Sequence, residues 1–219
     1  MERSILFDGM TREEIAGVLH CLDPRKLEYV KSDYILRAGQ TTDSIGLLLR
    51  GSVLVVQEDI WGRRSIVDKV APSEFFAVPF AASPGSVLNV SVVADDACTV
   101  MMLDMNKVLS ACSNACVYHV RIVRNLLSAL ASKTLRLNGK MTHMSKRTTK
   151  EKLLSFLSSE ALHSGSLSFS ISYSRQQLAD YLCVDRAAMS VALSDMQKEG
   201  LITYHKNEFV LHVEGEDLV

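Results

Sequence analysis

The sequence predicts an α+β protein in three parts: an N-terminal double-stranded β-helix (jelly roll), a long helix and a C-terminal winged helix-turn-helix. From about residue 26 to residue 104, short strand-like runs alternate with turn residues. Residues 106–137 then contain neither proline nor glycine. The last third has the pattern of two short helices followed by two strands. We expect the parts to span residues 1–105, 106–138 and 139–219.

The composition is that of a globular protein without a membrane span. The chain has 219 residues, of which 47% are hydrophobic, and a net charge of −1. It has no apolar run of about 18 residues and no signal-peptide pattern at its start. Its five cysteines form no CxxC pair, which favours free thiols and a cytoplasmic location. The near-zero net charge means that a surface for nucleic acid would have to be locally basic.

The N-terminal part begins with a short helix and continues as strands. Thr11 and Glu14 form a capping box at the start of the helix, and Asp23-Pro24 ends it. The predicted strands cover residues 34–37, 45–49, 52–58, 65–70, 89–94 and 98–103. Strands of this spacing are typical of a sandwich or jelly roll.

The long helix has an apolar face that suggests a dimer seam. Residues at three-and-four spacing along this face are Cys112, Cys116, His119, Ile122, Leu126, Leu130 and Leu137. Leu109, Val120 and Leu127 form a second apolar face, so a single barrel would leave one face uncovered. We therefore favour a parallel dimer over a helix packed only on its own barrel. Asn138-Gly139 is expected to break the helix and act as a hinge.

Two thiols and an imidazole share one face near the start of this helix. Cys112, Cys116 and His119 are spaced i, i+4 and i+7, so they could hold a metal or act as a redox switch. A disulfide within one regular helix is disfavoured by geometry, whereas a disulfide between chains is conceivable. The alternative is a seam of small residues with an ordinary buried histidine.

The stretch Ser174–Lys198 predicts a helix-turn-helix. Leu178, Ala179 and Leu182 share one face of a first helix. Asp185 is a suitable N-cap for a second helix, and Gly200 follows its end. Strands on either side of Lys206-Asn207 would complete a winged helix-turn-helix, which inserts its second helix into a DNA major groove. An ordinary helical corner is the alternative.

The residues expected to contact DNA lie in three places. Arg186, Ala187, Ser190 and Val191 are on the outer face of the second helix. Ser174 and Gln176 begin the first helix and are candidates for phosphate contacts. The basic stretch from Lys146 to Lys152 adds Lys146, Arg147 and Lys150.

The order of these parts resembles the Crp/Fnr family of bacterial transcription regulators over essentially the whole chain. The most specific pieces are Leu36-Arg-Ala-Gly39, Ile45-Gly-Leu-Leu-Leu-Arg-Gly-Ser-Val53 and Leu153–Lys198 with Glu199-Gly-Leu-Ile202. The resemblance implies a homodimer that is not an enzyme, in which an effector in or near the barrel repositions the DNA-binding domains. It also implies a pseudo-palindromic operator, with RNA polymerase as a further candidate partner.

The sequence departs from the pattern of cyclic-nucleotide members. Ser73-Glu74 stands where those members have Gly-Glu, and Leu88-Asn89 stands near their Arg-Ser pair. No arginine occurs between Arg64 and Arg121. Because a buried phosphate needs a matching cation, we expect no cAMP binding.

The sequence also lacks the residues that bind other cofactors of the family. Cys21 is the only cysteine before Cys98, so an iron–sulfur cluster is not expected. The barrel has no histidine for haem or for a metal-dependent barrel enzyme. Cys98, Met101 and Met102 could bind haem, but such residues on a strand are usually core.

The apolar stretch 75–82 lies where the phosphate-binding segment would be, and it is expected to form a loop. The predicted effector pocket, for a small apolar or aromatic molecule, comprises Glu74, Phe75, Phe76, Tyr34, Leu88, Asn89, Val123 and Leu127. Two alternatives are open: the stretch packs on the long helix as core, or the barrel binds nothing.

Base readout should also differ from that of well-known members. The resemblance places an arginine, a glutamate and a later arginine on the second helix, and only Arg186 matches. Arg186 can contact a guanine edge, worth about 1–3 kcal/mol of discrimination. Ala187 and Val191 replace the other two and offer apolar contact to thymine methyl groups, so we expect an operator richer in A·T.

Two other functions compete with a DNA-binding regulator that is gated by an effector. They are a redox regulator acting through Cys112 and Cys116, and a barrel enzyme with an interaction module.

Overall fold

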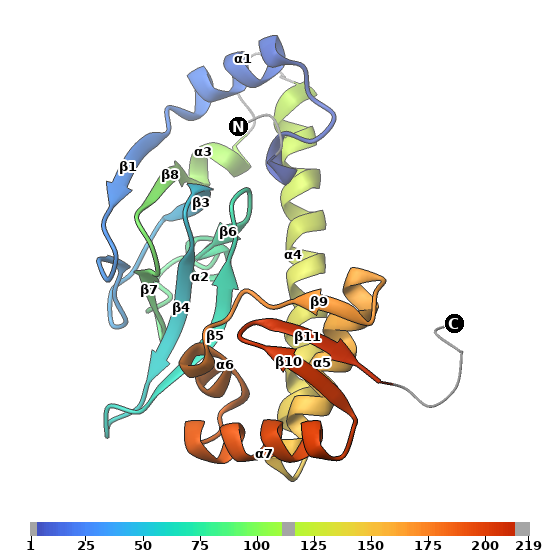
Figure 1. The fold of residues 1–219 in the computed structure, drawn as a ribbon. Helices are drawn as coiled ribbons and strands as arrows, with labels where there is room; N and C mark the ends of the chain where they lie inside the picture. The colour runs from blue at the N-terminus through green and yellow to red at the C-terminus, as the bar shows by residue number, and fades with distance from the viewer. Residues whose placement is uncertain (1–3, 111–116, 213–219) are drawn as a thin grey trace. The chain divides into compact units, whose positions relative to one another are not determined.

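The computed structural model describes residues 4–110 and 117–212. The chain divides into two compact units, Met1–Thr134 and Leu135–Val219 (Figure 1). The two units are defined by the contacts between their residues. The division into three parts, with boundaries after residues 105 and 138, stays a prediction.

The first unit opens with two helices. The short 3-10 helix η1 covers Ile5–Phe7, and α1 covers Arg12–Leu22. The predicted capping box is confirmed, since Thr11 Oγ1 accepts from Glu14 N and Glu14 Oε2 accepts from Thr11 N. Asp23 ends α1 in the left-handed conformation.

Eight strands form two four-stranded antiparallel sheets, which confirms the predicted jelly roll. The first sheet has the order β1 (Arg25–Tyr29), β8 (Cys98–Asp104), β3 (Ser44–Arg50) and β6 (Phe75–Phe76). The second has the order β2 (Tyr34–Leu36), β7 (Ser91–Ala94), β4 (Val53–Glu58) and β5 (Arg64–Val70). All six predicted strands are present, and β1 and β6 are additional.

Alternation along β8 divides the hydrophobic core into two layers. Val100 and Met102 point into the cluster between the two sheets. Met101 and Leu103 point to the other side, into a cluster that includes Ile15 of α1.

Helices cover the outer face of the first sheet. They are α1, α3 (Met105–Leu109) and α4 (Val117–Met144), whose first turns run beside the sheet (Figure 1). Ile122 and Leu126 of α4 are buried in the same cluster as Leu103. Asn125 fixes the N-terminal segment by donating to the carbonyls of Leu6 and Asp8.

The long helix differs from the prediction at both ends. The helical segment that begins at Met105 ends at Leu109, and Ser110 has an extended backbone. The predicted break at Asn138-Gly139 is wrong, because α4 continues through both residues to Met144. A glycine inside a helix costs only about 1 kcal/mol relative to alanine, which packing can offset.

The stretch 75–82 is also more regular than the loop that we expected. Phe75 and Phe76 form β6, which pairs with Gly46 and Leu47 of β3. Val78–Ala81 follow as the short helix α2.

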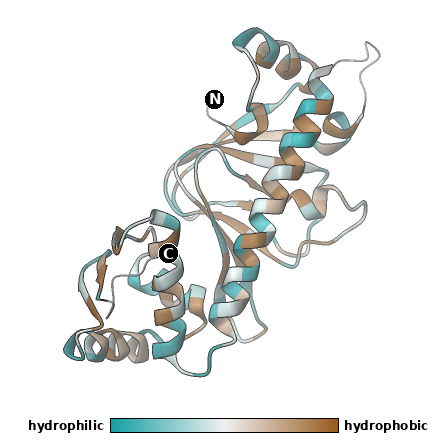
Figure 2. Cartoon of the chain, turned by 90° about the vertical axis from the view of Figure 1, so that its right-hand side faces the viewer, coloured by the Kyte–Doolittle hydropathy of each residue, from teal (hydrophilic) through white to brown (hydrophobic). Residues whose placement is uncertain are grey.

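The second unit is a winged helix-turn-helix, as predicted. After the end of α4 come α5 (Thr149–Ser164), β9 (Ser168–Ser170), α6 (Arg175–Leu182) and α7 (Arg186–Lys198). The hairpin β10 (Ile202–His205) and β11 (Glu208–Leu211) joins β9 in a sheet of order β10-β11-β9. The predicted apolar face of α6 is buried in one cluster with Phe156 of α5 and with Met189, Leu193 and Met196 of α7. The helices of this unit combine hydrophobic and hydrophilic residues, as amphipathic helices do (Figure 2).

Within the described ranges, none of the helices combines the length and the apolar character that crossing a bilayer requires.

Candidate nucleic-acid interface

The turn between α6 and α7 is held by backbone and side-chain bonds. Cys183 adopts the left-handed conformation, and Val184 N donates to Ala179 O at 3.0 Å. Asp185 caps α7 as predicted, with Oδ1 accepting from Ala188 N at 2.9 Å. Lys152 of α5 donates to Leu182 O at 3.3 Å, at the C-terminal end of α6, where a cation is favourable. These bonds fix the direction in which α7 leaves the turn.

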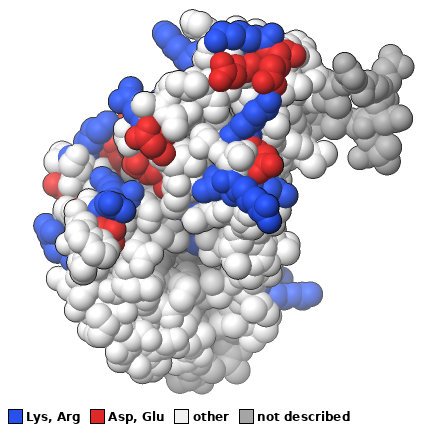
Figure 3. All heavy atoms as spheres, turned by 90° about the horizontal axis from the view of Figure 1, so that it is seen from below, with Lys and Arg blue, Asp and Glu red and all other residues white. Residues whose placement is uncertain are grey.

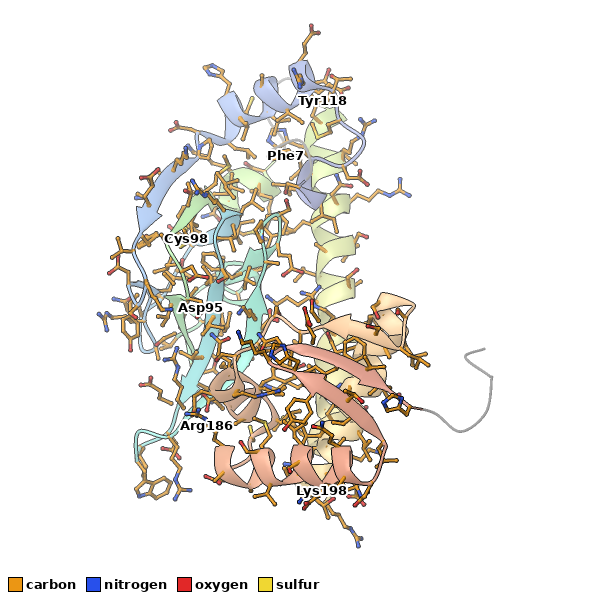
Figure 4. All side chains as sticks on the ribbon, viewed as in Figure 1. Phe7, Asp95, Cys98, Tyr118, Arg186 and Lys198 are labelled. Carbon is orange, nitrogen blue, oxygen red and sulfur yellow. The ribbon has the colours of Figure 1, made fainter. Side chains whose placement is uncertain are left out.

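α7 has one buried and one exposed face. Met189, Leu193 and Met196 are buried in the core of the unit. The predicted DNA-contact residues Arg186, Ala187, Ser190 and Val191 are all exposed, Val191 at 61%. Figure 4 shows Arg186 at the start of this helix. Ser190 Oγ donates to Arg186 O at 3.0 Å, so its hydroxyl proton is bonded to the helix itself.

Some of the side chains predicted to contact phosphates already have hydrogen-bond or ion-pair partners within the protein. Ser174 Oγ caps α6 by accepting from Gln177 N, and Gln176 Nε2 donates to Asp180 Oδ1 at 2.8 Å. Lys150 Nζ forms an ion pair with Glu199 Oε2. Lys146 and Arg147 have exposed side chains. The Lys and Arg side chains lie in separate groups, several of them beside acidic ones (Figure 3).

Arg175 holds the wing, a role that we did not predict. Its Nη2 donates to Lys206 O in the turn of the hairpin, where Lys206 has φ of 52°. The guanidinium carbon lies 5.0 Å from the ring centroid of Tyr204 and 5.1 Å from that of Phe209. Burial lowers the pKa of Arg175. Its place between Ser174 and Gln176, at the start of the first predicted helix, was the only signal in the sequence.

The end of α4 is packed into the helix-turn-helix unit. Lys140 and His143 are both buried. Lys140 Nζ lies 4.5 Å from the ring centroid of Tyr181 in α6, and His143 Nδ1 lies 2.8 Å from Ser155 Oγ in α5. Burial, followed by the charges of Lys146 and His163, lowers the pKa of His143. Sequence periodicity could not find these contacts because the helix was expected to end before them.

In the barrel, the predicted effector-pocket residues are largely core. Phe76 is fully buried between the sheets, and Phe75 is buried in the cluster that contains Ile122 and Leu126. Packing on the long helix as core, one of the two alternatives, describes Phe75, whereas Phe76 is core between the two sheets. Leu88 is also buried.

The polar members of that predicted pocket have other contacts. Glu74 Oε2 accepts from Ala71 N at 3.0 Å within its own turn. The exposed ring of Tyr34 lies under the guanidinium of Arg37, at 3.8 Å from its centroid. Asn89 is exposed.

The barrel buries much of the α4 face that we expected to form the dimer seam, and the second apolar face of α4 is exposed instead. His119, Ile122 and Leu126 are buried in this single chain, so they cannot form the exposed face of a dimer seam. Val120 and Leu127 are 72% and 67% exposed. Val123 is exposed as well, so the two α4 residues of the predicted effector pocket, Val123 and Leu127, are open to water in the single chain. Cys112 and Cys116 lie outside the described residues.

The side of α4 that faces the barrel also carries a cation. Lys133 Nζ lies 2.7 Å from Asp68 Oδ2 of β5 and donates to Phe75 O at 3.0 Å. Lys133 therefore continues the barrel-facing side, and the partly buried Ala129 and Leu130 also pack against the core cluster there.

Two family models match the chain, in the same order as the two domains. The model for the cyclic nucleotide-binding domain matches residues 26–115, and the model for the Crp-like helix-turn-helix domain matches residues 151–215. Together they cover well over half of the chain. No curated protein sequence matches it.

Solved structures share the fold at low sequence identity. FixK2 from Bradyrhizobium japonicum is 19% identical with a TM-score of 0.66, over 87% of this chain and 93% of that one. The c-di-GMP-responsive regulator CLP of Xanthomonas campestris is 17% identical with a TM-score of 0.71, over 91% of this chain and 100% of that one. A CooA variant from Carboxydothermus hydrogenoformans is 15% identical with a TM-score of 0.72, over 96% of this chain and 92% of that one.

Both matched domains and the shared fold lead to one assignment: the chain belongs to the Crp/Fnr family of transcription regulators.

Proposed function

We propose that this protein is a homodimeric, sequence-specific DNA-binding regulator and not an enzyme. The observation that carries the proposal is the exposed face of α7, which presents Arg186, Ala187, Ser190 and Val191 while its opposite face is core. A helix held in this way by a capped turn and a wing can enter a major groove.

The chemistry of this face suggests what it reads. Arg186 can donate two hydrogen bonds to a guanine edge, whereas Ala187 and Val191 offer only apolar contact to thymine methyl groups. Ser174, Lys146 and Arg147 are available for phosphates. Lys150 would have to exchange Glu199 for a phosphate, and Gln176 would have to exchange Asp180.

The exposed apolar face of α4 supports a dimer of parallel helices. Val120, Leu127 and Thr134 are spaced seven residues apart, and Val123 and Leu130 fall three residues after the first two. This is the a/d pattern of a two-stranded coiled coil, and in sequence it continues through Leu137, Met141 and Met144. We therefore propose these residues as the seam, in place of the buried set around Ile122.

Three features of the barrel argue against binding of a cyclic nucleotide. A Cβ on Gly46 would overlap Cζ of Phe76, so the Phe76 ring fills the space beside this strand. Leu88 is buried close to where the cation for a phosphate would be expected. Lys69, on the neighbouring sheet, lies 2.9 Å from Asp95 Oδ2. We propose that any effector of this protein is not a cyclic nucleotide.

The test begins with selection of binding sites from random duplexes, followed by titration of the selected duplex and a scrambled one at fixed salt. We expect Arg186→Ala to remove most of the discrimination between the two, by about 10-fold or more. Gln197→Ala, at the exposed far end of α7, serves as the matched control. If Arg186→Ala discriminates as well as wild type, the assignment of α7 as the reading helix is wrong.

A further inference from the structure

A cavity opens at the edge of the jelly roll, and neither α4 nor any residue of the predicted effector pocket lines it. Its volume is about 550 Å³, within the range of small-molecule sites. Its walls come from β1, β2, residues 41–44, residues 81–85, Met102 of β8 and Asn106 of α3. All of these belong to the first compact unit.

One end of the cavity is charged. Arg25 pairs with Met102 and Ser44 pairs with Asp104, so Arg25, Asp43 and Asn106 lie toward the same end of the sheet. In the described part of the chain, the Arg25 guanidinium makes no ion pair or hydrogen bond, with Asp43 or any other group. Among the same residues, the Asp43 carboxylate receives a hydrogen bond only from Ser44 Oγ, at 3.0 Å. A cation and an anion thus face one cavity without neutralising each other.

The rest of the cavity is apolar and partly open to water. Leu27 is 38% exposed and lines the cavity together with Tyr29, Leu36 and the buried Met102. Burial raises the pKa of the Tyr29 phenol, while the nearby charge of Arg25 lowers it. An apolar side chain that covered this wall would remove apolar surface from water, which favours binding.

From this arrangement we infer that the cavity binds a small zwitterion with a large apolar side chain, of the α-amino acid class. The carboxylate is held by Arg25 and Asn106, and the ammonium by Asp43. The side chain lies over Leu27, Leu36 and Met102. A simple organic anion fits less well, because Asp43 would repel it.

The site is tested by calorimetric titration of the full-length protein with L-phenylalanine, in the absence of DNA. Two analogues each lack one charge: 3-phenylpropionate has no ammonium, and phenethylamine has no carboxylate. We expect saturable binding of phenylalanine and binding at least 10-fold weaker for each analogue.

Two variants and a control assign the binding to this cavity. Arg25→Gln and Asp43→Asn should each weaken phenylalanine binding by 10-fold or more, and the amide oxygen introduced by Asp43→Asn can still accept from Ser44. Lys26→Gln changes the adjacent exposed residue of β1, which does not line the cavity, and should bind like wild type. Thermal unfolding checks that all three variants fold.

Three results would each overturn the inference. They are no saturable binding of phenylalanine, equal binding of 3-phenylpropionate, and unchanged binding in both variants. Because no DNA is present, none of these results bears on the proposed role of α7.

Discussion

The ammonium group of Lys140 lies 4.5 Å from the centre of the Tyr181 ring, which joins the end of α4 to the first helix of the helix-turn-helix. Three residues later, His143 contacts Ser155 and lies edge-on to Phe156, with ring centroids 5.9 Å apart. The last turns of α4 are therefore part of the core of the second unit. We expect them to move with α6, so that a change in the direction of α4 is transmitted to α7.

Replacing Lys140 should destabilise the second unit. A buried cation over an aromatic ring contributes about 2 kcal/mol, so Lys140→Ala should lower the free energy of unfolding by about 1–2 kcal/mol. Lys140→Arg keeps a cation that can stack on Tyr181 and should recover most of the loss. Urea unfolding followed by circular dichroism measures both. Equal destabilisation by alanine and arginine would show that the contact with the ring does not matter.

His143 should make stability depend on pH. Because the pKa of His143 in the folded protein lies below its ordinary value of 6.5, the unfolded chain binds more protons between these two values. The stabilisation from neutral His143 is therefore complete above pH 6.5 and is lost as the pH falls through the window below it. His143→Asn removes this dependence. Unfolding midpoints of wild type and variant, measured from pH 5 to pH 8, should differ in slope below 6.5, and parallel curves would contradict the prediction.

Gly46 and Phe76 should be energetically coupled. A methyl group at residue 46 would overlap Phe76 Cζ, so Gly46→Ala forces the ring to move. Overpacking of this kind costs about 1–3 kcal/mol. In a Phe76→Leu background the smaller side chain leaves room, and the same substitution should cost less. A double-mutant cycle from chemical denaturation gives the coupling, and strict additivity would mean that the cost of Gly46→Ala does not come from the Phe76 ring.

The sequence predicted the elements whose patterns are local. Asp185 as an N-cap and the apolar positions of α6 are each defined by neighbours within a few residues, and the structure confirms them. The strand β1 was missed because four of its five residues are exposed and show no alternation. Only its pairing with the distant β8, between Arg25↔Met102 and Tyr29↔Cys98, makes it a strand.

The features that sequence could not predict depend on contacts between distant segments. α4 is apolar on two faces, and periodicity cannot say which face meets the barrel; the structure shows that Ile122 does. Gly139 was expected to end the helix, yet burial of Lys140 and His143 offsets its low propensity. The open cavity beside Arg25 is formed by segments that are separate in sequence, so no motif marks it.

Leu126 and Leu127 are adjacent in sequence and should have opposite roles. Leu126 is 3% exposed and packs in the barrel core, whereas Leu127 is 67% exposed on the proposed seam. Leu126→Ala should lower the free energy of unfolding by about 2–5 kcal/mol, as buried leucine truncations do. Leu127→Lys instead places a charge at an a position of the coiled coil, where it opposes pairing.

Sedimentation velocity and chemical denaturation separate the two effects. We expect Leu127→Lys to sediment as a monomer at concentrations where wild type is a dimer, with its circular dichroism spectrum unchanged. The control Arg124→Lys changes an exposed residue one turn away, keeps its positive charge and should leave the dimer intact. If Leu127→Lys remains a dimer while Leu126→Ala dissociates without unfolding, the seam lies on the other face of α4 and the heptad assignment is wrong.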